Sequence, residues 1–386
     1  MKFLILIEDY NLFYSNYLKD NIFLNKKSYE FKLRYLLDKK YYQSDSLAKS
    51  LIDCHHQAEV VIPKCNLIQL SWAKENCLRL YFKWLMQKPI RSFKARVLKK
   101  NQDVYSSIHF EVLLQQVKNS QPDILYFYSN IFITEVQLEI LKKYVRKIVL
   151  QWTCPLWDNS MKFPYHKFDL IVTAAIQLKE YFDKLSYNCL YLQQAFDDSI
   201  LCHLNTKNYF KGDVVFIGNF SLGHYYRFEV LEFLLQNGVD LTIYGKGKDY
   251  IPKDSLVFKK LKEPIFGIDM YNEYRLYKMA IHAHTTGKEF DGIDWNKYAG
   301  AKRLFEITGV GTLLLTSDQE NVKDLFEIGE QVITYKSKED LYFKIKELLS
   351  DQHKIEFIAN QGMKRTLKEH SFSQRVKILE STLINL

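Results

Sequence analysis

Val214-Val215-Phe216-Ile217-Gly218 is the stretch that decides the fold class, because it is short, uncharged and flanked by polar residues. Such an apolar run is typical of a strand buried on both faces of a parallel sheet. The polar linker 203–213 precedes it, and a segment with helical spacing, 227–236, follows it and ends on the stop signal Asn237-Gly238. Strand, turn and helix in this order predict a right-handed crossover unit of an α/β fold.

Short apolar runs alternate with helical segments on both sides of this stretch. Because the pattern starts again after residue 203, we predict two Rossmann-like domains, 1–203 and 204–370, that face each other across a cleft. Ligands of such sheets bind at the carboxyl ends of the strands and between the domains. Besides 214–218, the expected strands are 3–7, 59–62, 124–128, 148–151, 170–173, 240–244, 280–283, 312–316 and 331–335, with helices over 110–119 and 136–144.

The composition places further bounds on the protein. A hydrophobic share of 47% and a charged share of 26% over 386 residues exclude disordered, collagen-like and simple coiled-coil chains. The net charge of +9 favours an anionic partner, namely a phosphorylated ligand, a nucleic acid or an acidic membrane surface. The chain has no long uncharged apolar stretch, so we expect neither a membrane span nor a signal peptide. The scattered cysteines, without a CxxC pair, lead us to expect reduced thiols in a cytoplasmic protein.

The stretch 303–316 carries the most informative polar residues of the chain. It reads as a helix, the turn Gly309-Val310-Gly311 and a buried strand. Arg303 and Glu306 are three residues apart and therefore share one helical face. A guanidinium matches the oxygens of a diphosphate, and a carboxylate accepts hydrogen bonds from the two hydroxyls of a ribose. The alternative is a surface ion pair beside an ordinary loop.

Other candidate residues lie where expected strands end. Gly218 ends one strand, and the loop 219–224 leads into a helix whose N-terminal N–H groups attract phosphate. His282 and His284 alternate along another strand, so their side chains face the same side. They are candidates for a metal site, for a phosphate or sugar contact by His284, or for a structural role. Arg227 either assists at the phosphates or is an exposed helical residue.

These motifs resemble the C-terminal domain of CgeB/spore-maturation-like glycosyltransferases, which belong to the GT-B superfamily and are similar to glycosyltransferase family four. The resemblance covers most of 214–375 and is weaker in the N-terminal half. Besides Arg303–Thr316, it rests on Ile217-Gly218, Tyr244-Gly245, Gly267, Tyr277, Ile281-His282-Ala283-His284, Asn321–Phe326, Gly329-Glu330, Arg365-Thr366-Leu367 and His370-Ser371-Phe372.

The resemblance implies a metal-independent GT-B enzyme that takes a sugar from a nucleotide-sugar, a UDP- or GDP-sugar, and needs no other cofactor. It assigns catalytic roles to His284, Arg303 and Glu306, with Arg303 on the diphosphate and Glu306 on the ribose. The expected donor-binding residues are Gly218, Asn219, His224, Arg227, Gly245, Phe266, Gly267, His282, Thr308, Gly309 and Gly311. The nucleobase of the donor is expected near Phe266-Gly267, with Tyr271 and Tyr274 as stacking partners. Alternatively to binding the donor, Gly309 and Gly311 only shape the turn between helix and strand.

One departure from the family pattern concerns the stereochemistry. Glu306 matches the second glutamate of the family's Glu-x7-Glu motif, but the first falls on Tyr298. The likeness to family four favours a retaining reaction, in which the donor phosphate takes the acceptor proton. An inverting reaction needs a general base. The candidates for it are Glu8, Asp53, His55, His56 and Asp158.

The acceptor side is expected in the N-terminal domain. Residues 78–100 contain eight basic side chains, no acidic one, and the aromatic residues Tyr81, Phe82, Trp84 and Phe93. This pattern is typical of an interfacial membrane segment, and also of a nucleic-acid groove or of a solvated helix with a buried aromatic face.

For a glycosyltransferase we expect a glycan or lipid-linked acceptor and no nucleic acid. The expected place is the cytoplasm, at the inner face of the membrane if residues 78–100 bind it. The resemblance further implies a role in bacterial surface glycan synthesis, of lipopolysaccharide or capsule, and a C-terminal helix over 371–386 that packs back on the N-terminal domain. Because the first glutamate is absent, the alternative is a non-catalytic nucleotide-sugar or glycan-binding protein on a degenerate GT-B scaffold.

Overall fold

The computed structural model divides the chain into two compact units. The first comprises 1–173, 182–190 and 382–386, and the second comprises 174–181 and 191–381. The predicted boundary at residue 203 and the packing of the C-terminal helix stay predictions. The structure describes residues 1–7, 21–40, 44–86, 107–128, 133–156, 163–206, 209–284, 293–295 and 297–386.

The first sheet has the strand order β2-β1-β3-β4-β5-β6. The neighbours from β2 to β5 pair in parallel, and β1 and β3 are buried along almost their whole length. Strand β6 was not expected, because it is only three residues long. The strands are β1 (Lys2–Ile7), β2 (Gln57–Val61), β3 (Ile124–Tyr128), β4 (Lys147–Gln151), β5 (Leu170–Thr173) and β6 (Cys189–Tyr191).

Local sequence signals fix the ends of the helices in this part of the chain. Thr134 and Gln137 form a reciprocal capping box at the start of α7, and the Ser28 side chain accepts from the Phe31 N–H at the start of α2. Residues 78–86 are also helical. The helices are η1 (Ile22–Lys26), α2 (Tyr29–Leu37), α3 (Ser44–Asp53), α4 (Asn66–Asn76), α6 (Ser107–Ser120), α7 (Glu135–Lys142), η3 (Tyr165–Lys167) and α8 (Ile176–Lys184).

The second sheet has the order β12-β11-β10-β7-β8-β9, and all its neighbours pair in parallel. In chain order this is the 3-2-1-4-5-6 arrangement of dinucleotide-binding folds, whose direction of winding reverses between the first and the fourth strand. Here those two strands are β7 and β10. The strands are β7 (Gly212–Ile217), β8 (Leu241–Tyr244), β9 (Leu261–Lys262), β10 (Tyr277–His282), β11 (Leu313–Ser317) and β12 (Ile333–Tyr335).

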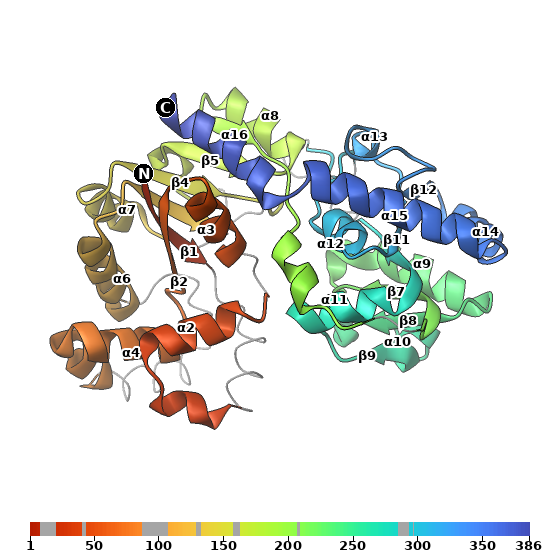
Figure 1. Cartoon of the computed structure of the whole chain (residues 1–386), viewed down its shortest axis with the longest axis horizontal. Coiled ribbons are helices and arrows are strands. Elements are labelled where there is room, and N and C mark those ends of the chain that lie inside the picture. Colours follow the sequence, from red (N-terminus) through yellow and green to blue (C-terminus); the bar gives the residue numbers. More distant parts are fainter. Residues whose placement is uncertain are drawn as a thin grey trace. The chain divides into compact units, whose positions relative to one another are not determined.

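Helices cover both faces of the second sheet (Figure 1). Val214 and Phe216 of β7 pack into an apolar cluster with side chains from α9 and α14, whereas Val215 and Ile217 pack into another with side chains from α11 and α12. The alternation explains why the deciding stretch is apolar at every position. The helices are η4 (Asp198–His203), η5 (Leu222–His224), α9 (Tyr225–Gln236), η6 (Lys248–Tyr250), α10 (Leu256–Lys260), α11 (Gly267–Arg275), α12 (Arg303–Gly309), α13 (Val322–Leu325), α14 (Lys338–Leu349), α15 (Gln352–Glu369) and α16 (Phe372–Ile384).

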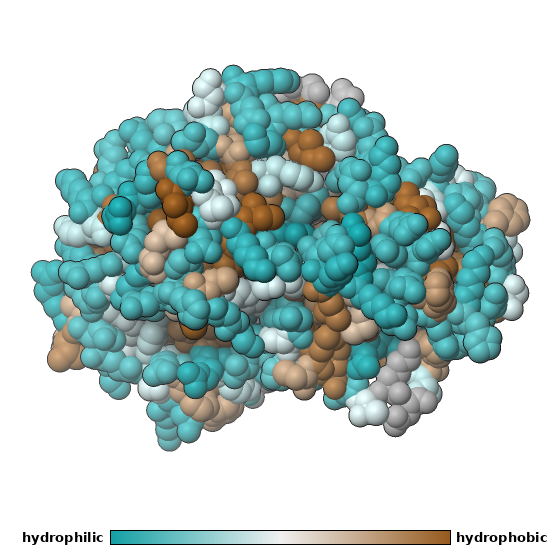
Figure 2. All heavy atoms as spheres, turned by 45° about the horizontal axis from the view of Figure 1, so that its top comes forward, coloured by the Kyte–Doolittle hydropathy of each residue, from teal (hydrophilic) through white to brown (hydrophobic). Residues whose placement is uncertain are grey.

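The surface carries little exposed apolar area on the face drawn in Figure 2, where hydrophobic residues form small groups among hydrophilic ones. Within the ranges that the structure describes, every helix is too short or too polar to cross a membrane.

Candidate active site

The reversal point of the second sheet brings several predicted residues to one edge. Strand β7 ends at Ile217 and leads into Gly218 and Asn219, while β10 ends at His282 and leads into His284. These two strands are hydrogen-bonded neighbours, so both exits lie at the same carboxyl edge. Ligands of doubly wound sheets bind outside this edge, where the winding reverses.

Arg227, near the start of α9, joins the two exits. Its Nη2 and Nε donate to the carbonyl oxygen of Ala283 at 2.9 and 3.3 Å, and its Nη1 donates to the carbonyl oxygen of Asn219. The side chain is buried, which lowers the pKa of the guanidinium to about 10 and leaves it charged at neutral pH. The interpretation of Arg227 as an exposed helical residue is therefore wrong.

Gly245 and Gly218 lie where β8 and β7 approach each other closely. The Gly218 N–H donates to the Tyr244 carbonyl oxygen at 2.9 Å. A Cβ on Gly245 would lie 1.9 Å from the carbonyl oxygen of Gly218, which no side chain tolerates. This contact gives Gly245 a packing role at the edge of the site.

His282 and His284 face the same side, as their alternation predicts, with ring centroids 4.5 Å apart and ring planes at 84°. His282 is buried: its Nδ1 lies 3.1 Å from the Thr316 hydroxyl, and its carbonyl oxygen accepts from the Tyr335 hydroxyl at 3.2 Å. Burial, with the neighbouring His284 and arginines, lowers the pKa of His282 well below its usual range. It serves as a structural support beneath His284.

His284 presents a ring nitrogen that has no partner among the described residues. Its main-chain N–H donates to the Ser317 hydroxyl at 3.2 Å, whereas its buried Nε2 has no hydrogen bond within the described part of the chain. Burial and the charge of Arg227 lower the pKa of His284 to about 4, so the imidazole is neutral at pH 7. Among the described residues, no group of three or more His, Cys, Asp or Glu is placed to hold a metal ion.

The carboxylate of Glu306 is the buried centre of a network on α12. Arg303 Nη1 lies 2.5 Å from Oε2, and Oε1 accepts from the Tyr271 hydroxyl at 3.1 Å and lies 3.4 Å from Lys302 Nζ. Glu306 is 1% exposed. Although burial opposes ionisation, the charges of Arg303 and Lys302 hold the pKa of this carboxyl below its usual range. The alternative of a surface ion pair does not describe this contact, because the Glu306 carboxylate is buried while Arg303 is partly exposed.

The expected base-stacking residues are not available for that role in this structure. Tyr271 and Tyr274 are 1% and 0% exposed and belong to the core between α11 and the sheet. Tyr271 instead orients Glu306. Phe266 and Gly267, at the start of α11, are half-buried and buried, and the positive φ of 55° at Gly267 explains the glycine there.

The turn after α12 is built by packing. Thr308 bonds the carbonyl oxygen of Leu304 and the Thr366 hydroxyl, both at 2.6 Å, and is buried. A Cβ on Gly309 would lie 2.5 Å from the ring of Phe196, and Gly311 has a φ of 75°. These contacts favour the alternative in which the two glycines shape the helix–strand turn, and Thr308 faces the core rather than a ligand.

Sequence reasoning missed the residues that support the candidates from neighbouring strands and loops. Ser317 holds the main chain of His284, and Ser221 lies 2.8 Å from Nδ1 of His224. Burial, with the charge of Arg227, lowers the pKa of His224 to about 4. Of the supporting residues, only Lys302 could have been predicted from the sequence, because it is four residues from Glu306 and therefore on the same helical face.

The expected acceptor-side bases do not gather at a ligand edge. Asp53, His55 and His56 come directly before β2, and therefore lie at the amino ends of the strands, opposite to the edge that binds ligands. Their proposed role as general bases is not supported. Glu8, Asp158 and residues 87–100 lie outside the described residues.

Known proteins show the same architecture. Residues 227–381 match the family model described as glycosyl transferase-like. This region is therefore similar to glycosyl transferase-like domains. The match confirms the predicted class of enzyme, a glycosyltransferase, while the narrower likeness to CgeB-like proteins stays a prediction.

Solved structures agree over the whole length. HepE of Anabaena in complex with UDP is 15% identical, covers 100% of both chains and has a TM-score of 0.52. The same protein in complex with UDP-glucose is 14% identical, covers 99% of this chain and 100% of its own, and has a TM-score of 0.52. Sucrose-phosphate synthase of Thermosynechococcus elongatus is 9% identical, covers 100% of both chains and has a TM-score of 0.53. These matches confirm the GT-B fold class.

Some further matches are partial. The chain spans 60% of the matched chain of the GtfA/B complex, with 15% identity and a TM-score of 0.45. No curated protein matches the sequence.

Proposed function

We propose that the protein transfers a sugar from a nucleotide-sugar, with UDP-sugars as the first candidates, to a glycan or lipid-linked acceptor. The observation that carries this proposal is Nε2 of His284, which has no hydrogen-bond partner among the described residues and lies beside the charge of Arg227 at the reversal point of a glycosyl transferase-like domain. The UDP bound to HepE, a protein of the same fold, supports the choice of nucleotide.

Each of these groups has a distinct task in the proposed reaction. Arg303, whose side chain is 27% exposed, would contact the diphosphate and stabilise the charge that develops as the nucleotide leaves. The neutral His284 can donate or accept one hydrogen bond, which suits a sugar hydroxyl or a phosphate oxygen. The resemblance assigns Glu306 to the ribose, but its carboxylate is 1% exposed and already accepts from Tyr271, so we assign it the positioning of Arg303.

We further propose that the transfer is retaining and independent of a metal ion. The acceptor oxygen then bonds to the anomeric carbon on the face that the diphosphate leaves, and the acceptor proton goes to an oxygen of the departing diphosphate. This route needs no protein base. The position of Asp53, His55 and His56 at the amino ends of the strands supports it.

A cytoplasmic enzyme at the inner face of a bacterial membrane, serving surface glycan synthesis, is the setting that we propose. Helix 78–86 supports a membrane contact, because Leu78, Phe82 and Met86 are 59, 58 and 78% exposed along one face. Leu80 and Trp84 are buried on the opposite face. An apolar outer face is typical of helices that lie in a membrane interface.

The test is calorimetry of UDP binding to the wild type, Arg303→Ala and His284→Ala. We expect roughly tenfold to hundredfold weaker binding for Arg303→Ala, since charge-assisted contacts are worth about 1.5–3 kcal/mol. Arg34→Ala is the matched control, because Arg34 makes an exposed helical ion pair with Glu30. Unchanged affinity of Arg303→Ala would remove the assigned diphosphate contact.

A second candidate function is binding without transfer. It is favoured by Tyr298 in place of the first glutamate and by the Arg303 contact that already occupies Glu306. Release of UDP from a panel of UDP-sugars, measured with and without glycan acceptors, separates the two. Binding with no release, for any donor, would favour the non-catalytic protein.

A further inference from the structure

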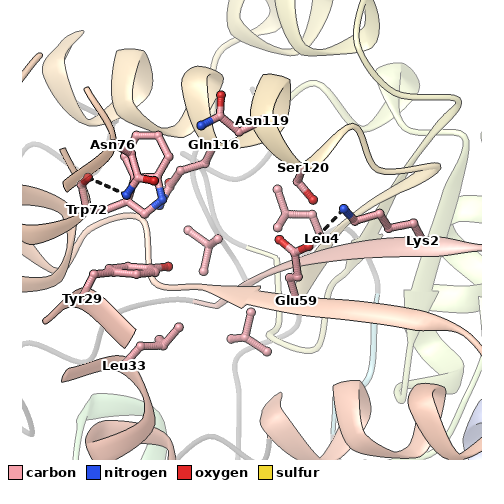
Figure 3. Close-up of a pocket in the computed structure, with 12 residues that line it drawn as sticks. Lys2, Leu4, Tyr29, Leu33, Glu59, Trp72, Asn76, Gln116, Asn119 and Ser120 are labelled. Atoms are coloured by element: carbon pink, nitrogen blue, oxygen red, sulfur yellow. Dashed lines mark hydrogen bonds and ion pairs between the residues drawn. The ribbon is translucent and has the colours of Figure 1, made fainter. Parts of the chain in front are cut away.

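A cavity of 380 Å³ lies in the first unit, against one face of strands β1 and β2 (Figure 3). Leu4 pairs with Glu59 across the two strands, so Lys2, Leu4 and Glu59 point to the same face. Helices α2, α4 and α6 contribute the remaining walls. All lining residues belong to the first unit, and Lys2 opens strand β1, so this cavity is separate from the donor-site candidates.

Two polar side chains of α6 line the cavity without satisfying their hydrogen bonds. Gln116 is 4% exposed, and neither atom of its amide has a partner among the described residues. The hydroxyl of Ser120, one turn further on, is buried and also has no partner within the described part of the chain. Each such buried group costs about 1–3 kcal/mol, and native proteins seldom leave one unpaired. A molecule in the cavity would satisfy both.

The charges around the cavity indicate a neutral molecule. Lys2 Nζ lies 3.1 Å from Oε1 of Glu59, so the two charges on the wall compensate each other. Burial and the charge of Glu59 raise the pKa of the Tyr29 phenol, which therefore stays protonated and can donate. A phosphate would find no surplus of cations here.

The walls combine polar groups with aromatic rings. The Gln116 amide requires an acceptor for Nε2 and a donor for Oε1, and a pair of hydroxyl groups supplies both. The rings of Trp72 and Tyr29 add apolar surface, which suits the C–H face of a sugar ring. The volume lies within the range of small-molecule sites.

We propose that this cavity binds a neutral sugar, as a carbohydrate site of the N-terminal unit that is distinct from the donor site. The proposal goes beyond the transfer reaction and does not depend on it. Gln116 and Ser120 bind hydroxyl groups, Tyr29 donates to one, and the aromatic rings contact the carbon skeleton.

Saturation-transfer NMR on the full chain tests the site with glucose, galactose, N-acetylglucosamine and maltose. At about 10 mM, roughly ten times a millimolar Kd, we expect a signal from at least one sugar. Gln116→Leu should weaken that binding at least about tenfold, the loss of one hydrogen-bonded polar group. Gln57→Leu, an exposed glutamine of β2 outside the cavity, and Arg303→Ala, measured at a temperature at which thermal unfolding shows it to be folded, should leave it unchanged.

Three outcomes overturn the proposal. No signal from any of the four sugars means a water-filled cavity. A signal that survives Gln116→Leu, or that Arg303→Ala abolishes, places the sugar elsewhere, in the second case at the donor site. Because Gln116→Leu removes an unpaired buried amide, its urea midpoint should not fall. If it nevertheless fails to fold, Ser120→Ala gives the same comparison with a smaller change.

Discussion

Arg375 donates a hydrogen bond of 2.9 Å from Nη2 to Nδ1 of His370. The other ring nitrogen of His370, Nε2, lies 2.9 Å from the carbonyl oxygen of Leu325 and donates to it. The ring is therefore a neutral imidazole with both nitrogens in use, at the point where α15 ends and α16 begins. A proton on Nδ1 would remove the acceptor that Arg375 requires.

This relationship predicts that the protein loses stability on acidification. Burial, together with the charge of Arg375, lowers the pKa of His370 to about 4, from an ordinary value of 6.5. The unfolded chain thus binds the proton first, so stability is complete above pH 6.5 and falls towards pH 4, by at most about 1.4 kcal/mol per pH unit for one group. The pKa values of His224 and His284 are also lowered, so these two residues change the stability in the same direction.

Urea unfolding between pH 7.5 and 4.5 measures this dependence. His370→Gln should give a shallower decline, because glutamine does not ionise, while the exposed His353→Gln should follow the wild type. Identical slopes for all three proteins would contradict the assignment to His370.

Arg227→Lys should weaken the edge of the second sheet. A lysine cannot bridge two carbonyl groups as the guanidinium fork does. We expect a loss of about 1–3 kcal/mol in the free energy of unfolding, because buried carbonyls of Asn219 and Ala283 lose their donor. Arg365→Lys, at a helical ion pair with Glu369, is the control and should change little. A stable Arg227→Lys protein would show that the bridge is dispensable.

Gly245→Ala should be more harmful than the same change at Gly223. The methyl group at Gly245 meets the Gly218 carbonyl oxygen, so β7 and β8 must separate; overpacking of this kind costs about 1–3 kcal/mol or more. No atom lies within 4 Å of a Cβ at Gly223. Thermal unfolding of both variants compares the sites, and an equal effect would contradict the close approach.

Arg303→Met should destabilise the protein more than the double change Arg303→Met with Glu306→Gln. The single change leaves the Glu306 carboxylate buried without its main counter-charge, a loss of about 3–5 kcal/mol for a broken buried pair. The amide of the double variant carries no charge and can still accept from Tyr271. Urea unfolding of the single and double variants gives the coupling energy. Additive effects would show that the two side chains do not interact.

Phe82→Ser with Met86→Ser should reduce binding to vesicles that contain anionic lipid. The two side chains form part of the exposed apolar face of helix 78–86, and their loss removes the surface that would enter the membrane interface. Phe343→Ser with Phe357→Ser is the matched control in the second unit, since these rings are 68 and 55% exposed. Co-sedimentation is the measurement, and equal binding of both double variants would remove the membrane role of this helix.

The strands and the central ion pair follow from local patterns, and the structure confirms both. The uncharged run at 214–218 becomes β7, and the spacing of three residues brings Arg303 and Glu306 into contact. The depth of this pair was not predictable, because Tyr271 reaches it from α11, more than thirty positions away.

Other roles that depend on long-range packing could likewise not be predicted from the sequence. The pattern places Gly245 at a strand end, but the reason for a glycine is the Gly218 carbonyl on another strand. Asp53, His55 and His56 are residue types that can act as general bases, yet only the strand direction shows that they belong to the amino edge. Cavity-lining Gln116 carried no motif at all.

The bridge made by Arg227 has a mechanical consequence. Because one guanidinium holds both the chain after β7 and the chain after β10, neither exit can shift by itself without breaking a hydrogen bond. The main chain at Asn219 and the main chain at Ala283, next to His284, are therefore coupled through a single side chain of α9.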